Sequence, residues 1–481
     1  MKVLFAAPEA YPFIKTGGLG DVAGSLPKAL AKAGEEIRVI IPLYENVMEQ
    51  HTEEMEFVMY TYITLGWRKQ YCGLFKLEQG GVVYYFVDNE YYFKRQGCYG
   101  FYDDAERFAF FSRAVYELLP LLEDFKPDVV HSNDWQTALI PIYIREDKRE
   151  FYRSIRTVFT IHNIEYQGEY SADLLGDVFG LPRVLYDNGM MAFIKEQRKD
   201  INLMKGALYA ADYITTVSPT YAQELKDPYY AHGLHLVIQE ISLRMRGIIN
   251  GIDNRVYSPA MDRNLYKNYS KKDLSNKAEN KMELQNLLNL KVDKDIPIIV
   301  CISRLVAHKG FDLILSVIDE IMAENLQLII LGTGDWPFEQ GLIEASHRYQ
   351  GKLSVNIMFS QALASQLYGS ADMLLMPSRS EPCGLSQMIA MRYGTVPIVR
   401  ETGGLKDTVS PYRSPYSTGF TFSNYEASDM LYVIKEALQL YHEDKEVWNE
   451  LVLRCMNEDF SWRNSAKEYK EVYDYITGGL E

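Results

Sequence analysis

Short, continuously apolar segments recur along the first half of the chain and alternate with segments that carry apolar residues at helical spacing. The first two lie at residues 2–7 and 36–41, with a helical segment at roughly 21–33 between them. The others lie at residues 128–131, 157–161, 213–217 and 247–249. Fully apolar strands that alternate with helices are typical of a parallel sheet covered on both faces. The pattern therefore predicts an α/β domain with a Rossmann-like sheet.

A second series of the same kind follows a polar, Lys- and Asn-rich stretch at roughly 262–282. Its apolar segments lie at residues 297–302, 326–331, 354–358, 373–376 and 396–399. The polar stretch is the best candidate for a connection between two domains, with a surface helix as the alternative. Residues 55–87 alternate apolar and polar positions, which predicts an antiparallel insertion or edge. The tail, roughly 426–476, is predicted to be helical throughout.

Length, charge and cysteine content narrow the class of protein. The chain has 481 residues, too many for one ordinary core, and a formal net charge of −15. That charge argues against nucleic acids and anionic membranes as main partners. No apolar run approaches the ~18 residues of a membrane-spanning helix, and the apolar start is too short for a secretory signal. The five scattered cysteines fit a reducing cytosol and no zinc site.

The tetrapeptide Thr-Gly-Gly-Leu precedes a predicted helix in each half, at residues 16–19 and 402–405. Glycine permits positive φ and lets a ligand approach the bare main chain. The helix behind it would direct free N–H groups and its positive end at that ligand. Two such loops favour two Rossmann-like domains that face one anionic ligand across a cleft. The tetrapeptide alone is weak evidence, because a common turn can occur twice by chance.

Polar and charged residues follow nearly every predicted strand in both halves, at the sheet edge where open α/β sheets bind ligands. The first half supplies Lys15, Asp134, His162, Asn163 and Asn250. The second half supplies Arg304, Lys309 and Glu381. Several have ordinary alternatives: a solvated loop lysine for Lys15, a helix cap for Asp134 and a structural histidine for His162. The recurrence of such residues at strand ends favours a binding site.

The cations of this set suit the diphosphate of a sugar nucleotide. Arg304, Lys309 and Lys15 are candidate ligands for it, with N–H donors from the second Gly-Gly loop. Negative charge grows on the leaving phosphate as the glycosidic bond breaks, so these cations would stabilise the transition state above the ground state. As exposed cations, Arg304 and Lys309 are expected to contribute little to folding. The groups suited to sugar hydroxyls are Asp21, His162, Asn163 and Glu381.

At these positions the sequence resembles the bacterial and plant glycogen and starch synthases, retaining glycosyltransferases with two facing Rossmann-like domains, the GT-B arrangement. The resemblance runs in order through nearly the whole chain. Its most specific part combines Lys15-Thr16-Gly17-Gly18-Leu19 with Glu381-Pro382-Cys383-Gly384-Leu385. The other matching stretches are His162-Asn163, Asn250-Gly251-Ile252-Asp253, Ser303-Arg304-Leu305 with Lys309-Gly310, and Thr402-Gly403-Gly404-Leu405.

The resemblance implies transfer of glucose from ADP-glucose to the non-reducing end of an α-1,4-glucan or maltooligosaccharide, with retention and without a metal or cofactor. It implies an N-terminal domain over residues 1–250 for the acceptor and a C-terminal domain over 251–460 for the sugar nucleotide. A helix over 461–481 would cross back to the first domain. It implies a cytoplasmic enzyme, or a stromal one in a plastid, and leaves a homo-oligomer open.

The resemblance also implies roles for single residues. Arg304 and Lys309 would bind the donor phosphates, and His162 would lie beside the anomeric carbon. Glu381 would contact the glucose hydroxyls. The implied catalytic residues are Lys15, His162, Arg304, Lys309 and Glu381. The implied substrate-binding residues are Lys15, Gly17, Gly18, Asp21, Asp134, Asn163, Asn250, Arg304, Lys309, Glu381, Cys383, Gly384, Thr402, Gly403, Gly404 and Leu405.

Two motifs depart from the family pattern. His131-Ser132-Asn133-Asp134-Trp135-Gln136 stands where His-x-His-Asp-Trp-His is usual, and Gly233-Leu234-His235-Leu236 stands where Gly-Leu-Asp/Glu-Gly is frequent. The donor side keeps its pattern, so the departures bear on the acceptor side. They leave open a catalytically weak homologue that serves as a glucan-binding or regulatory subunit. An NAD-dependent enzyme is disfavoured, because the first glycine loop is not Gly-x-Gly-x-x-Gly.

Overall fold

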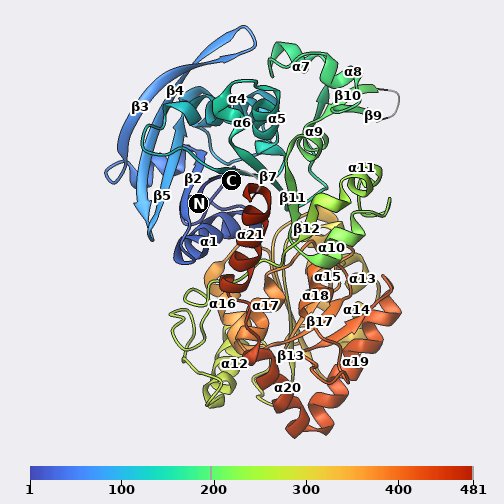
Figure 1. Cartoon of the computed structure of the whole chain (residues 1–481). Helices are drawn as coiled ribbons and strands as arrows, with labels where there is room; N and C mark the ends of the chain where they lie inside the picture. The colour runs from blue at the N-terminus through green and yellow to red at the C-terminus, as the bar shows by residue number, and fades with distance from the viewer. Residues whose placement is uncertain (196–197, 479–481) are drawn as a thin grey trace. The chain divides into compact units, whose positions relative to one another are not determined.

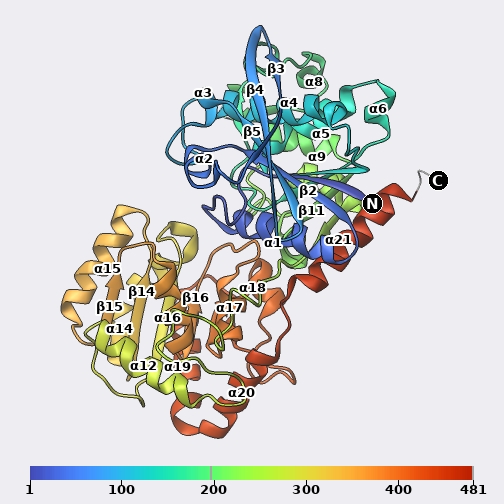
Figure 2. The same cartoon turned by 90° about the vertical axis from the view of Figure 1, so that its left-hand side faces the viewer.

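A computed structural model of the chain describes residues 1–195 and 198–478. The chain forms two compact units, which can be followed by colour in Figures 1 and 2. The first comprises Met1–Gly251 together with Trp462–Glu481, and the second comprises Ile252–Ser461. Each unit has its own sheet and its own buried apolar core.

The first unit is built on a nine-stranded sheet in the order β12-β11-β7-β6-β1-β2-β5-β4-β3. Neighbouring strands are parallel from β12 to β5, and β4 and β3 add an antiparallel edge. The strands span Lys2–Ala6 (β1), Glu36–Pro42 (β2), Glu56–Leu65 (β3), Arg68–Gln79 (β4), Val82–Asp88 (β5), Val129–Asn133 (β6), Arg156–Ile161 (β7), Tyr213–Thr216 (β11) and Met245–Gly247 (β12). Val3 of β1 lies opposite both Ile37 and Val129, so β1 is a central strand.

The antiparallel insertion predicted over residues 55–87 is confirmed for β3 and β4, which pair as a hairpin. It is confirmed only in part for β5, which pairs antiparallel with β4 on one edge but in parallel with Arg38–Pro42 of β2 on the other. Tyr84, Tyr85 and Phe86 are consecutive and at most 2% exposed, so β5 is covered on both faces like the other central strands. The change from an antiparallel hairpin to a buried central strand therefore falls within residues 55–87.

Helices and a small antiparallel sheet complete the first unit. They span Gly18–Lys32 (α1), Glu45–His51 (α2), Glu90–Phe93 (α3), Asp104–Leu118 (α4), Leu139–Glu146 (α5), Glu150–Arg153 (α6), Glu169–Ser171 (β8), Leu174–Asp177 (α7), Val184–Asp187 (α8), Ala192–Lys195 (β9), Arg198–Asn202 (β10), Leu203–Ala210 (α9), Pro219–Glu224 (α10), His235–Glu240 (α11) and Trp462–Thr477 (α21). The last helix, α21, lies beside α1 in both views (Figures 1 and 2). Its Tyr473 hydroxyl is 2.7 Å from Nδ1 of the buried His131 on β6.

The second unit is built on a six-stranded parallel sheet in the order β15-β14-β13-β16-β17-β18. Counted from β13, this is the order 3-2-1-4-5-6 of dinucleotide-binding folds. The elements span Ser275–Leu287 (α12), Ile298–Ile302 (β13), Phe311–Ser316 (α13), Ile318–Ala323 (α14), Gln327–Leu331 (β14), Trp336–Arg348 (α15), Leu353–Asn356 (β15), Gln361–Ser370 (α16), Met373–Met376 (β16), Ser386–Arg392 (α17), Val396–Arg400 (β17), Gly403–Thr408 (α18), Phe420–Phe422 (β18), Ala427–Glu443 (α19) and Lys445–Asn457 (α20). In both sheets the strand order reverses once, beside β1 and β6 in one and β13 and β16 in the other.

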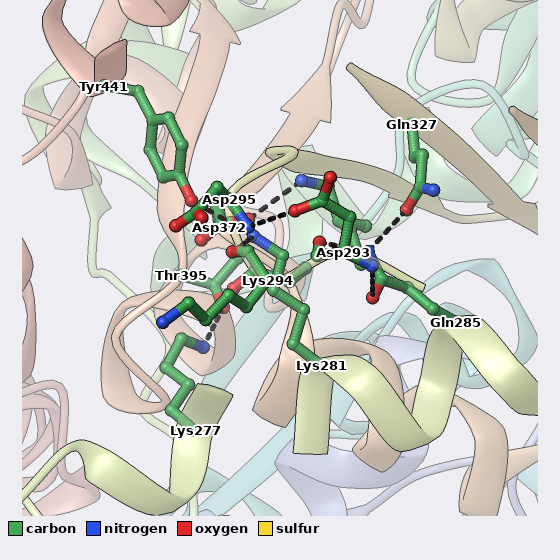
Figure 3. A network of polar contacts seen from close by, with 12 residues as sticks. Lys277, Lys281, Gln285, Asp293, Lys294, Asp295, Gln327, Asp372, Thr395 and Tyr441 are labelled. Atoms are coloured by element: carbon green, nitrogen blue, oxygen red, sulfur yellow. Dashed lines mark hydrogen bonds and ion pairs between the residues drawn. The ribbon is translucent and has the colours of Figure 1, made fainter. Parts of the chain in front are cut away.

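The polar stretch at 262–282 does not connect the units, and that prediction is wrong, because the stretch lies within Ile252–Ser461. Its second half opens α12, whose inward face is itself polar (Figure 3). Lys281 Nζ lies 2.8 Å from Asp372 Oδ2 and donates to the Tyr441 hydroxyl. Gln285, one turn further on, is hydrogen-bonded to the side chain of Gln327 at 2.8 Å. A helix that buries polar side chains against polar partners cannot be told from a linker by hydropathy.

We expect Lys281→Ala to lower the free energy of unfolding by about 3–5 kcal/mol, because it leaves a buried carboxylate without its counter-charge. The Lys281 and Asp372 side chains are only 4% and 14% exposed. The matched control is Lys291→Ala, whose side chain is 70% exposed. Urea unfolding measures both variants, and equal midpoints for the two would contradict the expected role.

Candidate functional site

In the first unit, the loop after β1 is organised by the buried carboxylate of Glu9. Glu9 accepts the Thr16 N–H at 2.7 Å, the Thr16 hydroxyl at 2.6 Å and the Gly20 N–H at 3.1 Å. Burial raises the pKa of Glu9, and the hydrogen bonds from Thr16 and Gly20 oppose that shift. The N–H groups predicted to be free at this helix start are thus partly occupied. The predicted positive φ is also wrong at Gly17, which has an extended φ of −157°.

Lys15 and Asp21, which flank this loop, form an ion pair. Lys15 Nζ lies 2.7 Å from both carboxylate oxygens of Asp21, in the first turn of α1. Burial raises the pKa of Asp21, while the Lys15 ammonium opposes the shift. A Cβ built on Gly17, between the two, would meet no atom within 4 Å. The loop therefore offers open main chain beside a paired cation and anion.

Asp134, directly after β6, holds the backbone that follows β7. Its Oδ1 accepts the His162 N–H at 2.7 Å. Its own φ of 56° with ψ of 177° lies in a region that glycine alone adopts readily, which stores roughly 1–3 kcal/mol of strain. Burial raises the pKa of Asp134 to about 7, against the hydrogen bonds from His162 and Asn163. A strained carboxylate with a raised pKa is typical of a functional site.

We expect Asp134→Asn to be more stable than the wild type at pH 8 by about 1–3 kcal/mol, and nearly equal to it at pH 4. The folded pKa lies above that of the unfolded chain. The contribution of Asp134 to the free energy of unfolding is therefore complete below about pH 4, where the carboxyl is protonated. It is lost as the pH rises through 7. The amide keeps an acceptor for the His162 N–H and carries no charge. Thermal melts at both pH values test this, with the 60% exposed Asp187→Asn as control. The same difference at both pH values would contradict it.

His162 and its neighbours lie at the carboxyl end of β7. Its Nε2 is 2.9 Å from Oδ1 of Asn133. Burial lowers the pKa of His162 to about 3, so the ring is neutral at pH 7. Asn163, the next residue, orders the chain by accepting the Glu165 N–H at 3.0 Å. Asn250 is 5% exposed, and its Oδ1 is buried without a hydrogen-bond partner in the described part of the chain.

Three further residues belong to the candidate site of the first unit but are not among its predicted site residues. They are Glu9, Asn133 and Tyr99. The pKa of Tyr99 is raised well above its usual value by burial and by nearby groups that include the carboxylates of Glu9 and Asp134. It stands in an irregular segment between α3 and α4 that carries no recognisable motif. The sequence holds one indication for Glu9. It is a charged residue close after a buried strand, and charged residues in such places are rarely buried without partners.

In the second unit, Lys309 and Glu381 form a buried ion pair. Lys309 Nζ donates to both carboxylate oxygens of Glu381, at 2.8 and 2.7 Å, and the Ser378 hydroxyl donates to Oε2 at 3.0 Å. Burial acts to raise the pKa of Glu381, but Lys309 and Ser378 hold it below its usual value. The Lys309 side chain is 15% exposed, so the expectation of a solvated cation is wrong for it.

Arg304, the second residue after the end of β13, is the contrasting cation of this unit. It is exposed, and within residues 1–195 and 198–478 its guanidinium makes no ion pair. It follows β13, whereas Glu381 follows β16, and these strands are neighbours where the sheet order reverses. The free guanidinium and the paired ammonium thus both lie on the loop after β13, and the carboxylate that pairs with the ammonium lies on the loop after β16. These are the two loops at which such sheets bind ligands.

Two glycines let the loops of this unit approach one another. Gly310 has a φ of +81°, and a Cβ there would lie 2.2 Å from the carbonyl oxygen of Pro377. Gly403 has a φ of +43°, and a Cβ there would lie 2.0 Å from the carbonyl oxygen of Glu381. The Gly404 N–H donates to that same carbonyl at 3.1 Å. The second Thr-Gly-Gly-Leu thus supports the backbone of Glu381.

The remaining predicted residues of this unit are largely enclosed. Thr402 and Leu405 are both 0% exposed. Cys383 is 4% exposed, and Gly384 adopts a φ of +73° just before α17. The phosphate cradle at Thr402–Leu405 stays a prediction. Across the described residues, no group of three or more His, Cys, Asp or Glu side chains could hold a metal ion.

Comparison with known proteins follows the same division of the chain. The family "Starch synthase catalytic domain" matches residues 2–240, and "Glycosyl transferases group 1" matches residues 286–450. A glycogen synthase of Clostridium acetobutylicum is 47% identical over 98% of this chain and 99% of its own. One of Alkaliphilus metalliredigens is 48% identical with the same coverage.

Solved structures agree with this assignment. The catalytic domain of starch synthase IV from Arabidopsis thaliana, bound to ADP and acarbose, is 34% identical with a TM-score of 0.90 over 99% of each chain. Sucrose-phosphate synthase from Thermosynechococcus elongatus is 16% identical with a TM-score of 0.60 over 99% of each chain, and shares the fold.

Two Rossmann-like units, each with charged residues at its sheet reversal, define this protein as a glycosyltransferase of the GT-B fold. The chain belongs to the family of bacterial and plant glycogen and starch synthases. The relatives match over their full length and give no support to the alternative of a regulatory subunit. None of the helices that the structure describes is long and apolar enough to cross a membrane.

Proposed function

We propose that this chain is a retaining transferase that moves glucose from ADP-glucose to the non-reducing 4-hydroxyl of an α-1,4-glucan. The observation that carries the proposal is the Lys309–Glu381 pair beside the unpaired Arg304 at the reversal of the second sheet. The Arabidopsis relative was solved with ADP and acarbose, which fits a nucleotide-sugar donor and a glucan acceptor.

The second unit is assigned the donor. Arg304 supplies an uncompensated positive charge, and Lys309 supplies an ammonium whose position is fixed by two short bonds to Glu381. As the bond from glucose to the β-phosphate breaks, negative charge accumulates on the departing oxygen. Cations already held in place stabilise that charge without reorganisation. The proposal needs no metal, since side-chain cations supply the charge.

The first unit is assigned the acceptor and part of the contacts to the glucose hydroxyls. The Lys15–Asp21 pair offers both a donor and an acceptor beside open main chain at Gly17. The neutral His162 can hydrogen-bond a sugar hydroxyl but cannot supply a proton at pH 7. Asp134 holds His162 and Asn163 through their backbone N–H groups.

Retention is proposed to arise by displacement on the face from which ADP departs. The acceptor oxygen bonds to the anomeric carbon as the bond to phosphate breaks, and the leaving phosphate takes the acceptor proton. No enzyme carboxylate bonds to the sugar in this scheme. It fits Glu381, whose oxygens are engaged by Lys309 and Ser378.

The direct test incubates the purified chain with ADP-glucose and maltooligosaccharide and follows ADP release together with chain growth. Both should occur, and a parallel reaction with UDP-glucose reports the base preference. Glucan binding without ADP release would instead support a binding subunit. ADP release without chain growth would indicate hydrolysis and refute the acceptor assignment.

A further inference from the structure

Asn133, in the motif that departs from the family pattern, is fully buried and touches the ring of His162. It ends β6, it is 0% exposed, and its Oδ1 lies 2.9 Å from His162 Nε2. Its amide nitrogen donates to the carbonyl of Ala6 at 3.0 Å. Because a carbonyl oxygen only accepts, that bond fixes the orientation of the amide. The group that faces the imidazole is therefore the acceptor oxygen.

An acceptor opposite Nε2 decides which ring nitrogen carries the proton. The ring is neutral, since burial lowers the pKa of His162 to about 3. A neutral imidazole has one N–H and one lone pair, so Nε2 carries the hydrogen and Nδ1 the lone pair. In the part of the chain that the structure describes, no protein group hydrogen-bonds to Nδ1. Nδ1 can therefore accept a hydrogen bond but not donate one.

The geometry points to Asn133 as a positioning residue that fixes this tautomer, so that Nδ1 of His162 accepts a hydrogen bond from a sugar hydroxyl of the substrate. The identity of the substrate rests on the proposed function, whereas the tautomer rests on the contacts alone. The histidine usual at this position can present either a donor or an acceptor, but the asparagine held by Ala6 presents an acceptor only. Partners that orient metal-bound histidines are typically worth 10–100-fold in metal affinity or activity, and we take this range as the scale expected for Asn133.

A merely structural role for Asn133 would consist of its hydrogen bond to Ala6, which joins β6 to β1, and it makes a different prediction. Loss of that hydrogen bond would lower kcat/KM by the same factor whatever residue stands at position 162. A positioning role acts through His162 and disappears with its ring. A double-mutant cycle separates the two roles.

The cycle uses Asn133→Leu, which removes the acceptor at similar volume, alone and together with His162→Ala. We expect Asn133→Leu to lower kcat/KM about 10–100-fold in the wild type and to cause no further loss in the His162→Ala background. Equal losses in both backgrounds would overturn the inference. Ser132→Ala is the matched control, because Ser132 is the preceding residue of β6 and its buried hydroxyl has no partner within the described chain. It should leave kcat/KM unchanged.

Nitrogen NMR of protein with 15N-labelled histidine gives a readout that needs no turnover. The His162 signals, assigned by their absence in His162→Ala, should show a protonated Nε2 and an unprotonated Nδ1 from pH 5 to 8. Asn133→Leu should abolish that preference. A protonated Nδ1 in the wild type would refute the inference even if the chain proves to be an active synthase. The expected tautomer in a chain without transferase activity would instead refute only the proposed function.

Discussion

Lys309→Ala should lower both turnover and stability, whereas Arg304→Ala should lower turnover alone. Both changes remove a cation proposed to meet the donor diphosphate, and we expect each to reduce kcat/KM by about two to four orders of magnitude, since ~1.4 kcal/mol is tenfold in rate. Only Lys309 is also buried against a carboxylate, with side chains 15% and 8% exposed in the pair. Its removal leaves Glu381 unpaired, which should cost about 3–5 kcal/mol of unfolding free energy.

Steady-state kinetics and urea unfolding of the two variants test this contrast. Arg304→Ala should unfold within about 0.5 kcal/mol of the wild type, because an exposed side chain without partners contributes little. The wholly exposed Leu243 offers a neutral reference, as Leu243→Ala should alter neither property. Unchanged stability of Lys309→Ala would show that the ion pair is not maintained in solution. Wild-type turnover in both cation variants would refute the diphosphate assignment.

Glu381→Gln should lose roughly 100- to 1,000-fold in kcat, about 3–4 kcal/mol of activation free energy, and yet accumulate no glucosyl-enzyme. The amide cannot fix the Lys309 ammonium as the carboxylate does with bonds of 2.8 and 2.7 Å. A carboxylate nucleophile would have to leave these bonds to attack the anomeric carbon. The low pKa that Lys309 gives to Glu381, despite its burial, also makes it a weak nucleophile.

Intact-mass spectrometry on this variant, and on the wild type with a slow donor analogue, supplies the measurement. No mass gain of one glucosyl unit should persist on either protein. The exposed Glu344→Gln serves as the control for loss of one carboxylate, and its kcat should match the wild type. A stable glucosyl adduct mapped to Glu381 would replace front-face displacement with a covalent mechanism.

The sequence by itself determined the main strands of the two Rossmann-like sheets and the polar and charged residues that follow those strands. Fully apolar runs such as residues 297–302 and 373–376 are typical of strands covered on both faces, so hydropathy predicts β13 and β16. Parallel strands place their carboxyl ends at one edge, which is why Arg304 and Glu381 could be linked without coordinates. The family resemblance rests on local sequence motifs, so it also could be stated without the structure.

Only the tertiary structure decided which of these residues face one another. Lys309 and Glu381 are 72 positions apart, and the sequence of neither loop indicates that the two side chains form an ion pair. The polar composition of α12 predicts a linker or a surface helix, because hydropathy reports the character of a side chain and not the partner that satisfies it. The tautomer of His162 likewise depends on Asn133, which itself is oriented by Ala6 on another strand. Burial follows from local composition, but pairing, protonation and strain follow from contacts made across the sheet.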